Sequence, residues 1–241
     1  METLYNSIMQ RYLLCLTLLG LLLFAACAGR TPQNDQAATR RDDKTTTPAI
    51  NSSSGKSLPK IVAFGDSLTA GLGLSTAESY PSILQEKLRA DGYQYEVVNA
   101  GVSGDTSAGG GRRIDWSLEG DVRFVILELG ANDLLRGLPV AEMKKNLSAI
   151  IARAKSRGAK VLLAGMYSLT SLGSDYQREV HEAFRSLARE HDVPLIPFFL
   201  EGVAGDPKLN QPDGVHPNAD GTRIVADTVY RYLRPILDEK E

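Results

Sequence analysis

Short apolar runs alternate with stretches of helical spacing from Lys60 onward. Short, mostly apolar runs bounded by turn residues are typical of buried strands, and they predict strands at 60–64, 95–98, 122–127, 161–164 and 195–196. Between them, apolar residues recur every three or four positions, which predicts helices at 80–90, 139–157, 176–188 and 224–233. The chain thus repeats a strand followed by a helix.

This alternation predicts a parallel sheet, because each crossover helix returns the chain to start the next strand in the same direction. We expect one α/β domain over residues 59–236, with three layers (α/β/α) and a five-stranded parallel sheet. The third run is mostly apolar and is expected at the centre of the sheet. Pro194 and Pro197 flank the fifth run and favour an edge position, since proline cannot donate to a neighbouring strand.

The N-terminus has the pattern of an export signal. Arg11 precedes an uncharged apolar run at 12–26, which is shorter than the roughly 20 residues of a membrane-spanning helix. Ala26-Cys27-Ala28 fits an ordinary signal peptidase site, which would give a soluble protein. Phe24-Ala25-Ala26-Cys27 resembles a bacterial lipobox, in which Cys27 is lipidated. We favour the lipoprotein, because Cys27 is otherwise a lone thiol in an exported protein.

Residues 27–58 contain almost no large apolar side chains and are predicted to form a disordered tether. The predicted organisation is a signal peptide at 1–26, the tether at 27–58, the domain at 59–236 and a tail at 237–241. A lipid on Cys27 would hold the domain at the bacterial cell envelope, in the outer membrane or periplasm of a Gram-negative cell. The alternative is a secreted or periplasmic soluble protein.

Composition excludes several classes of protein. The 241 residues carry a formal net charge of −2, which argues against nucleic acid as a partner. Both cysteines, Cys15 and Cys27, precede the domain, so the domain has neither a disulfide nor a thiolate metal site. The sequence implies no metal or organic cofactor, and it leaves the oligomeric state undetermined.

Polar residues follow the predicted strands at the positions where ligands bind in parallel sheets. Ser67 follows the first strand, Gly104 the second and Asn132 the third, while Asp213 and His216 lie between the fifth strand and the last helix. All strands of a parallel sheet end at the same edge, so we expect these residues to converge there.

The convergent residue types suit acyl transfer. Ser67 is the candidate nucleophile, His216 its general base and Asp213 the anion that orients the imidazole. The backbone N–H groups of Ser67 and Gly104, with the Asn132 amide, are candidate oxyanion donors. A simpler alternative remains for two of them, in which Ser67 only caps the next segment and Asp213 only makes a turn.

Other charged residues near these positions are interpreted as structural. Asp66, Asp105 and Asp133 are expected to be turn or cap residues that hold their loops in shape. Arg112 and Arg113 are expected on a helix surface.

The motifs Gly65-Asp66-Ser67-Leu68, Gly104, Gly130-Ala131-Asn132-Asp133 and Asp213-Gly214-Val215-His216 resemble, in order, blocks of the SGNH, or GDSL, hydrolase family. The chain is most similar to the thioesterase I/lysophospholipase L1 (arylesterase-like) branch. The resemblance implies a flavodoxin-like fold and an esterase, thioesterase or lysophospholipase that works through a Ser-Asp-His triad and an acyl-enzyme. Two features depart from that branch: the tether with Cys27, and Gly165-Met166-Tyr167 where relatives tend to carry arginine and proline.

Leu134, Leu135 and Arg136 follow Asn132 and are candidate substrate-binding residues. The leucines could line an acyl channel or belong to the core, and Arg136 could contact a substrate anion or remain solvated. The expected partner is an acyl ester or lysophospholipid-like substrate. Two alternatives are a deacetylase of cell-envelope carbohydrate on the same fold and a non-catalytic lipid-binding lipoprotein. Thr69 disfavours an α/β-hydrolase, whose Gly-x-Ser-x-Gly motif needs glycine there.

Overall fold

The computed structural model describes residues 57–167 and 173–239. Its strands are β1 (Lys60–Gly65), β2 (Glu96–Gly101), β3 (Val122–Glu128), β4 (Lys160–Ala164) and β5 (Leu195–Ile196). Its helices are α2 (Ser67–Ala70), α3 (Tyr80–Ala90), α4 (Ser107–Ser117), α5 (Ala131–Leu135), α6 (Val140–Ser156), α7 (Ser174–His191) and α8 (Ala219–Asp238), with a 3-10 helix η1 (Thr76–Glu78). The predicted signal peptide, Cys27 and most of the tether lie outside the described residues.

The five strands form one parallel sheet in the order β2-β1-β3-β4-β5. The predicted fold class is therefore confirmed, with β3 at the centre and β5 at an edge. The strand order reverses between β1 and β3, and ligands bind beside such a reversal in open α/β sheets. Gly65 pairs with Gly101 of β2 and with Glu128 of β3, so these three strands end level with one another.

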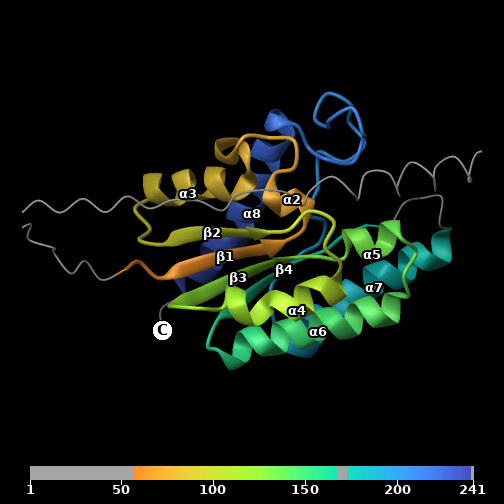
Figure 1. Ribbon diagram of the computed structural model, residues 1–241, viewed down its shortest axis with the longest axis horizontal. Helices are drawn as coiled ribbons and strands as arrows, with labels where there is room; N and C mark the ends of the chain where they lie inside the picture. The colour runs from red at the N-terminus through yellow and green to blue at the C-terminus, as the bar shows by residue number, and fades with distance from the viewer. Residues whose placement is uncertain (1–56, 168–172, 240–241) are drawn as a thin grey trace, which may run out of the picture. The chain divides into compact units, whose positions relative to one another are not determined.

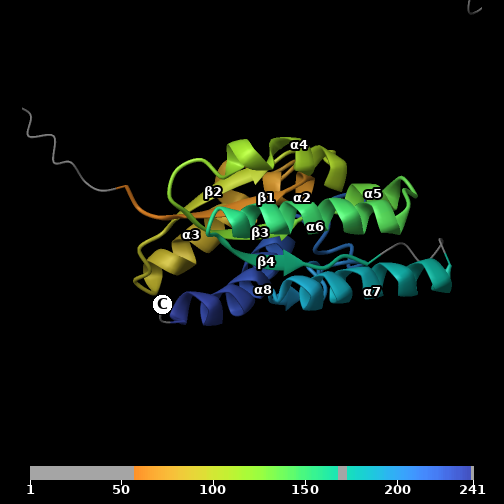
Figure 2. The ribbon, with the colours of Figure 1, turned by 90° about the horizontal axis from the view of Figure 1, so that it is seen from below.

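Helices cover both faces of the sheet (Figures 1 and 2). α3 and α8 pack together on one face, while α4, α6 and α7 pack side by side on the other. The inner strands β1, β3 and β4 are almost wholly buried between these layers, as continuous apolar runs require. Among the described residues, no helix is both long and apolar enough to span a membrane.

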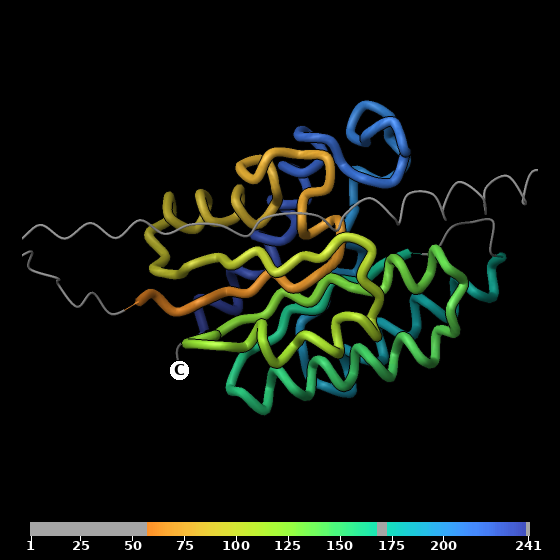
Figure 3. The backbone as a smooth tube through the Cα atoms, viewed as in Figure 1, coloured from red at the N-terminus to blue at the C-terminus, as the bar shows by residue number. Residues whose placement is uncertain are grey.

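Capping residues set where the helices near the site begin. Thr106 accepts a hydrogen bond from the Gly109 N–H at the start of α4, and Asn218 accepts from the Asp220 and Gly221 N–H groups at the start of α8. Residues 131–135, which lie outside the predicted helices, form the short helix α5. Figure 3 shows the segments after β1, β2 and β3 and the long connection from β5 to α8 at one end of the sheet.

Candidate active site

Ser67 lies at the turn from β1 into α2. Asp66 is the N-cap of α2, and its Oδ1 accepts a hydrogen bond of 3.0 Å from the Leu68 N–H. This cap holds Ser67 at the first helical position, with its side chain at the sheet edge. The Ser67 Oγ lies 2.9 Å from His216 Nε2, and His216 Nδ1 lies 2.7 Å from Asp213 Oδ2. The structure thus brings together three residues from segments almost 150 positions apart.

The Asp213 carboxylate is held by its own loop. Its Oδ1 accepts hydrogen bonds from the His216 N–H at 3.0 Å and the Val215 N–H at 2.9 Å. These two backbone hydrogen bonds, followed by that of the His216 side chain, lower the pKa of Asp213 to about 2. The carboxylate is therefore ionised at neutral pH and fixes Nδ1 as the protonated nitrogen of a neutral imidazole, which leaves Nε2 free to accept the serine proton.

The three predicted oxyanion donors lie in the segments that follow β1, β2 and β3. Ser67 is the first residue of α2, where a backbone N–H has no acceptor within the helix. Gly104 has a φ of +81°, a conformation that favours glycine, in the loop after β2. Asn132 lies in α5, and its Nδ2 donates to Asp66 Oδ2 at 2.9 Å. One amide hydrogen is used in that bond, so the other remains for a ligand.

Two further contacts tie these loops together. Asp133 is buried, and its two carboxylate oxygens accept hydrogen bonds from the N–H of Ser107 at 2.8 Å and from its hydroxyl at 2.6 Å. Arg136 donates to the Gly104 carbonyl oxygen at 2.8 Å. Asp133 thus holds its loop as expected, by joining α5 to α4. Arg136 joins α5 to the loop of Gly104, one of the predicted oxyanion donors.

A buried polar cluster that was not predicted from the sequence lies next to the turn that carries Ser67. Glu128 is fully buried, and its Oε2 accepts hydrogen bonds from the Thr69 hydroxyl at 2.7 Å and the Asp66 N–H at 3.2 Å. Tyr80, also buried, lies with its hydroxyl 3.4 Å from Thr69 Oγ1. The signal available in the sequence was an acid directly after the four apolar residues 124–127, at the end of a strand predicted to be buried.

Burial is the largest cause of the shifted pKa values of the two acids in this cluster, Glu128 and Asp66. It raises the pKa of Glu128 well above its ordinary value, and the neighbouring Asp66 charge raises it further. Burial also raises the pKa of Asp66 to about 6, although the hydrogen bonds from Leu68 and Asn132 oppose the shift. The cluster also explains Gly65, since a Cβ there would lie 2.1 Å from Thr69 Oγ1 and 2.4 Å from Glu128 Oε2.

The candidate substrate-binding residues Leu134 and Leu135 differ in their exposure to solvent. Leu134 is 3% exposed and packs in the core, so of its two alternatives the core position holds and a place in an acyl channel is wrong. Leu135 is 49% exposed beside the proposed oxyanion donors. Tyr167, which follows β4, is 52% exposed and stacks on Phe198 with ring centroids 4.2 Å apart.

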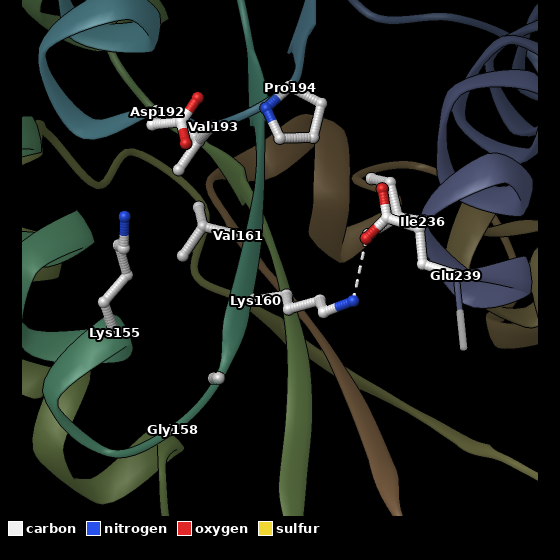
Figure 4. A pocket seen from close by; sticks show the side chains of 10 residues that line it. Lys155, Gly158, Lys160, Val161, Asp192, Val193, Pro194, Ile236 and Glu239 are labelled. Carbon is white, nitrogen blue, oxygen red and sulfur yellow. Dashed lines mark hydrogen bonds and ion pairs between the residues drawn. The ribbon is translucent and has the colours of Figure 1, made fainter. Parts of the chain in front are cut away.

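A hollow of about 610 Å³ lies at the opposite, amino-terminal edge of the sheet (Figure 4). Its lining includes Lys155, Val161 and Pro194, and Lys160 forms an ion pair of 2.8 Å with Glu239 across it. None of the triad or oxyanion residues lines it. Within the described ranges, no cluster of three or more histidine, cysteine or acidic residues could hold a metal ion.

Comparison with known proteins identifies the family of this chain. Residues 63–224 match the model of the GDSL-like Lipase/Acylhydrolase family, and the chain belongs to this family. Esterase TesA of Pseudomonas aeruginosa is 39% identical over 178 residues, which cover 73% of this chain and 89% of that protein. Thioesterase 1/protease 1/lysophospholipase L1 of Escherichia coli is 36% identical over 179 residues, which cover 74% of this chain and 85% of that protein.

Solved structures give the same picture of the fold. The crystal structure of TesA superposes with a TM-score of 0.71 at 39% identity, covering 73% of this chain and 99% of that one. The SGNH-hydrolase family esterase AlinE4 superposes with a TM-score of 0.63 at 44% identity, and the match covers 76% of this chain and 98% of that one. The predicted membership of the SGNH, or GDSL, family is confirmed.

Proposed function

We propose that this protein is a serine hydrolase that cleaves acyl ester or thioester bonds through an acyl-enzyme on Ser67. The observation that carries the proposal is the continuous hydrogen-bonded line from Ser67 Oγ through the His216 ring to Asp213, at 2.9 and 2.7 Å. A nucleophile, a base and an orienting acid in that arrangement are the parts of a catalytic triad.

The first half of the reaction forms the acyl-enzyme. Ser67 Oγ attacks the acyl carbonyl carbon while His216 Nε2 takes the serine proton, and the carbonyl oxygen becomes an oxyanion. The N–H groups of Ser67, Gly104 and the Asn132 side chain stabilise that charge. The intermediate then collapses, the bond to the alcohol or thiol breaks, and His216 returns its proton to the leaving group.

The second half releases the acid. A water molecule gives a proton to His216 and attacks the Ser67 ester through a second oxyanion. Collapse of this intermediate breaks the serine–acyl bond, and His216 returns the proton to Ser67 Oγ. The products are a carboxylic acid and an enzyme ready for the next substrate.

An apolar acyl chain is the substrate class that the surroundings favour. Leu135, the last residue of α5, and Tyr167, just after β4, are half exposed at the catalytic edge, where they offer apolar surface to a chain attached to the reacting carbonyl. The names of the relatives include an esterase, a thioesterase and a lysophospholipase. We therefore propose acyl esters, acyl thioesters or lysophospholipids as substrates, ahead of acetylated carbohydrate.

The test is hydrolysis of acyl esters from two to about sixteen carbons, with a thioester, a lysophospholipid and an acetylated sugar included. Ser67→Ala should abolish hydrolysis of every substrate, whereas Ser103→Ala, at an exposed serine after β2, should leave it unchanged. Full activity of Ser67→Ala would overturn the proposal. A preference for the acetylated sugar would keep the serine hydrolase but make it a carbohydrate deacetylase.

We also propose that a lipid on Cys27 anchors the domain to the bacterial envelope. The support is the apolar run ending in Phe24-Ala25-Ala26-Cys27 and the polar stretch that follows it. Metabolic labelling with an alkyne fatty acid should tag the wild type and Cys15→Ser, but not Cys27→Ser. An unmodified mature N-terminus at Ala28 would contradict the anchor and favour the soluble alternative.

A further inference from the structure

Two neighbouring arginines of α4 have different environments. Arg112 is exposed and donates to the Ala108 carbonyl of its own helix at 3.1 Å. Arg113, which we expected on the helix surface, turns inward, and its side chain is only 18% exposed. The guanidinium lies 4.0 Å above the centre of the Phe64 ring. The expectation for Arg113 is therefore wrong, because the side chain packs towards the sheet edge.

Three acceptors surround the Arg113 guanidinium. Its Nε donates to Asp105 Oδ2 at 2.7 Å, one terminal nitrogen donates to the Ala100 carbonyl at 2.8 Å, and the other donates to the Gly65 carbonyl at 2.8 Å. These acceptors belong to the loop after β2, to β2 itself and to the last residue of β1. A single planar group thus joins three parts of the backbone.

The acceptors lie beside the backbone oxyanion donors. Gly65 stands two residues before Ser67, and Asp105 directly follows Gly104. The Gly65 carbonyl also accepts a hydrogen bond of 3.0 Å from the Val102 N–H, which reinforces the same junction. Arg113 therefore connects the backbone that presents the Ser67 N–H with the backbone that presents the Gly104 N–H.

Helix α4 is shaped to admit this contact. A Cβ at Gly109 would lie 1.7 Å from Asp105 Oδ1, so a larger residue there would displace the carboxylate that Arg113 holds. A Cβ at Gly110 would lie 2.3 Å from the Leu129 side chain. The glycines in this helix let it approach the loop and the sheet closely enough for Arg113 to reach all three acceptors.

We propose that Arg113 is a positioning residue that sets the spacing between the Ser67 and Gly104 N–H donors. This inference rests on the proposed function, since it concerns the oxyanion of the same reaction. A guanidinium is a rigid fork whose donors point in fixed directions, and lysine cannot satisfy three separate acceptors in that plane. Replacing Arg113 should therefore misplace one donor, and a displacement of about 1 Å can cost up to about 10²-fold in rate.

The experiment compares Arg113→Met and Arg113→Lys with Arg112→Met, using one short-chain ester. Both Arg113 variants should lose about 10- to 100-fold in kcat with little change in KM, because the oxyanion forms only after binding. Arg112→Met should match the wild type. Melting temperatures of all variants distinguish a loss of rate from a loss of fold. If Arg113→Met does not fold, the kinetic comparison is made with Arg113→Lys.

A second readout distinguishes positioning from general destabilisation. Methylguanidinium added to folded Arg113→Ala should restore part of kcat, since it can occupy the vacated, partly exposed position. Wild-type kcat in both Arg113→Lys and Arg113→Met would overturn the inference while leaving the proposed function intact. Activity retained in Ser67→Ala would instead overturn the proposed function.

Discussion

The Asn132 side-chain amide donates a hydrogen bond to the Asp66 carboxylate at 2.9 Å, which ties the proposed oxyanion donor to the residue before the nucleophile. The same carboxylate caps α2 through the Leu68 N–H at 3.0 Å. One buried acid thus orients both the side chain that would stabilise the oxyanion and the helix that carries Ser67. Its burial beside Glu128 makes this arrangement sensitive to charge.

The first prediction concerns Asn132. Replacing it by alanine removes one donor to the oxyanion and should lower kcat by roughly 10²- to 10³-fold, with a much smaller change in KM. Steady-state kinetics on a single ester measures both constants. A variant that mainly raises KM would make Asn132 a contact to the substrate in its ground state.

The second prediction concerns pH and the stability of the fold. Burial raises the pKa of Asp66 from 3.8 to about 6, so the folded protein holds this proton more tightly than the unfolded chain does. The resulting stabilisation is present below pH 4 and is lost as pH rises through about 6, with an upper limit of roughly 3 kcal/mol. Glu128 acts in the same direction.

Urea unfolding of the wild type and of Asp66→Asn between pH 4 and 7 measures this effect. The free energy of unfolding should fall less steeply with rising pH in Asp66→Asn, because asparagine does not titrate. The exposed Glu119→Gln serves as a control and should keep the wild-type slope. Identical slopes in Asp66→Asn and the wild type would show that Asp66 does not titrate in this range.

The third prediction concerns Asp213. Its replacement by asparagine removes the anion that holds the His216 ring in the reactive tautomer, and kcat should fall by up to about 10⁴-fold. Because hydrogen bonds from His216 and Val215 lower the pKa of Asp213 to about 2, this carboxylate stays ionised throughout a kinetic pH range of 5 to 9. A wild-type rate in Asp213→Asn would remove Asp213 from the triad.

The fourth prediction contrasts two adjacent leucines. Leu135→Ala, at a half-exposed position, should lower kcat/KM more for long acyl esters than for acetyl esters, at up to about 0.8 kcal/mol per buried methylene. Leu134→Ala should instead destabilise the fold by about 2–5 kcal/mol, because this side chain is buried. Rates across a chain-length series and urea unfolding measure the two effects. Equal losses for all chain lengths in Leu135→Ala would exclude it from acyl selection.

The fold could be predicted from the sequence because its signal is local. The apolar runs of β1, β3 and β4 and the spacing in α6 and α8 depend on neighbouring positions alone. The convergence of the strand-end residues then follows from parallel topology, since all strand ends share one edge.

What could not be predicted depends on side chains from distant segments. Nothing near Arg113 in the sequence distinguishes it from Arg112, because its three acceptors lie on β1, β2 and the following loop. Glu128 ends a strand whose burial was predicted, yet its partners Thr69 and Asp66 come from the turn after another strand. Leu134 and Leu135 differ only in which side of α5 they occupy.

The central claim is that Ser67 carries the acyl group, and identification of the covalently modified residue tests it most directly. The protein is treated with a fluorophosphonate, which reacts with activated serines, and the modified peptide is located by mass spectrometry. The account predicts one modification, on Ser67, with none in Ser67→Ala and an unchanged one in Ser103→Ala. Modification of another residue, or equal labelling of folded Ser67→Ala, would contradict it.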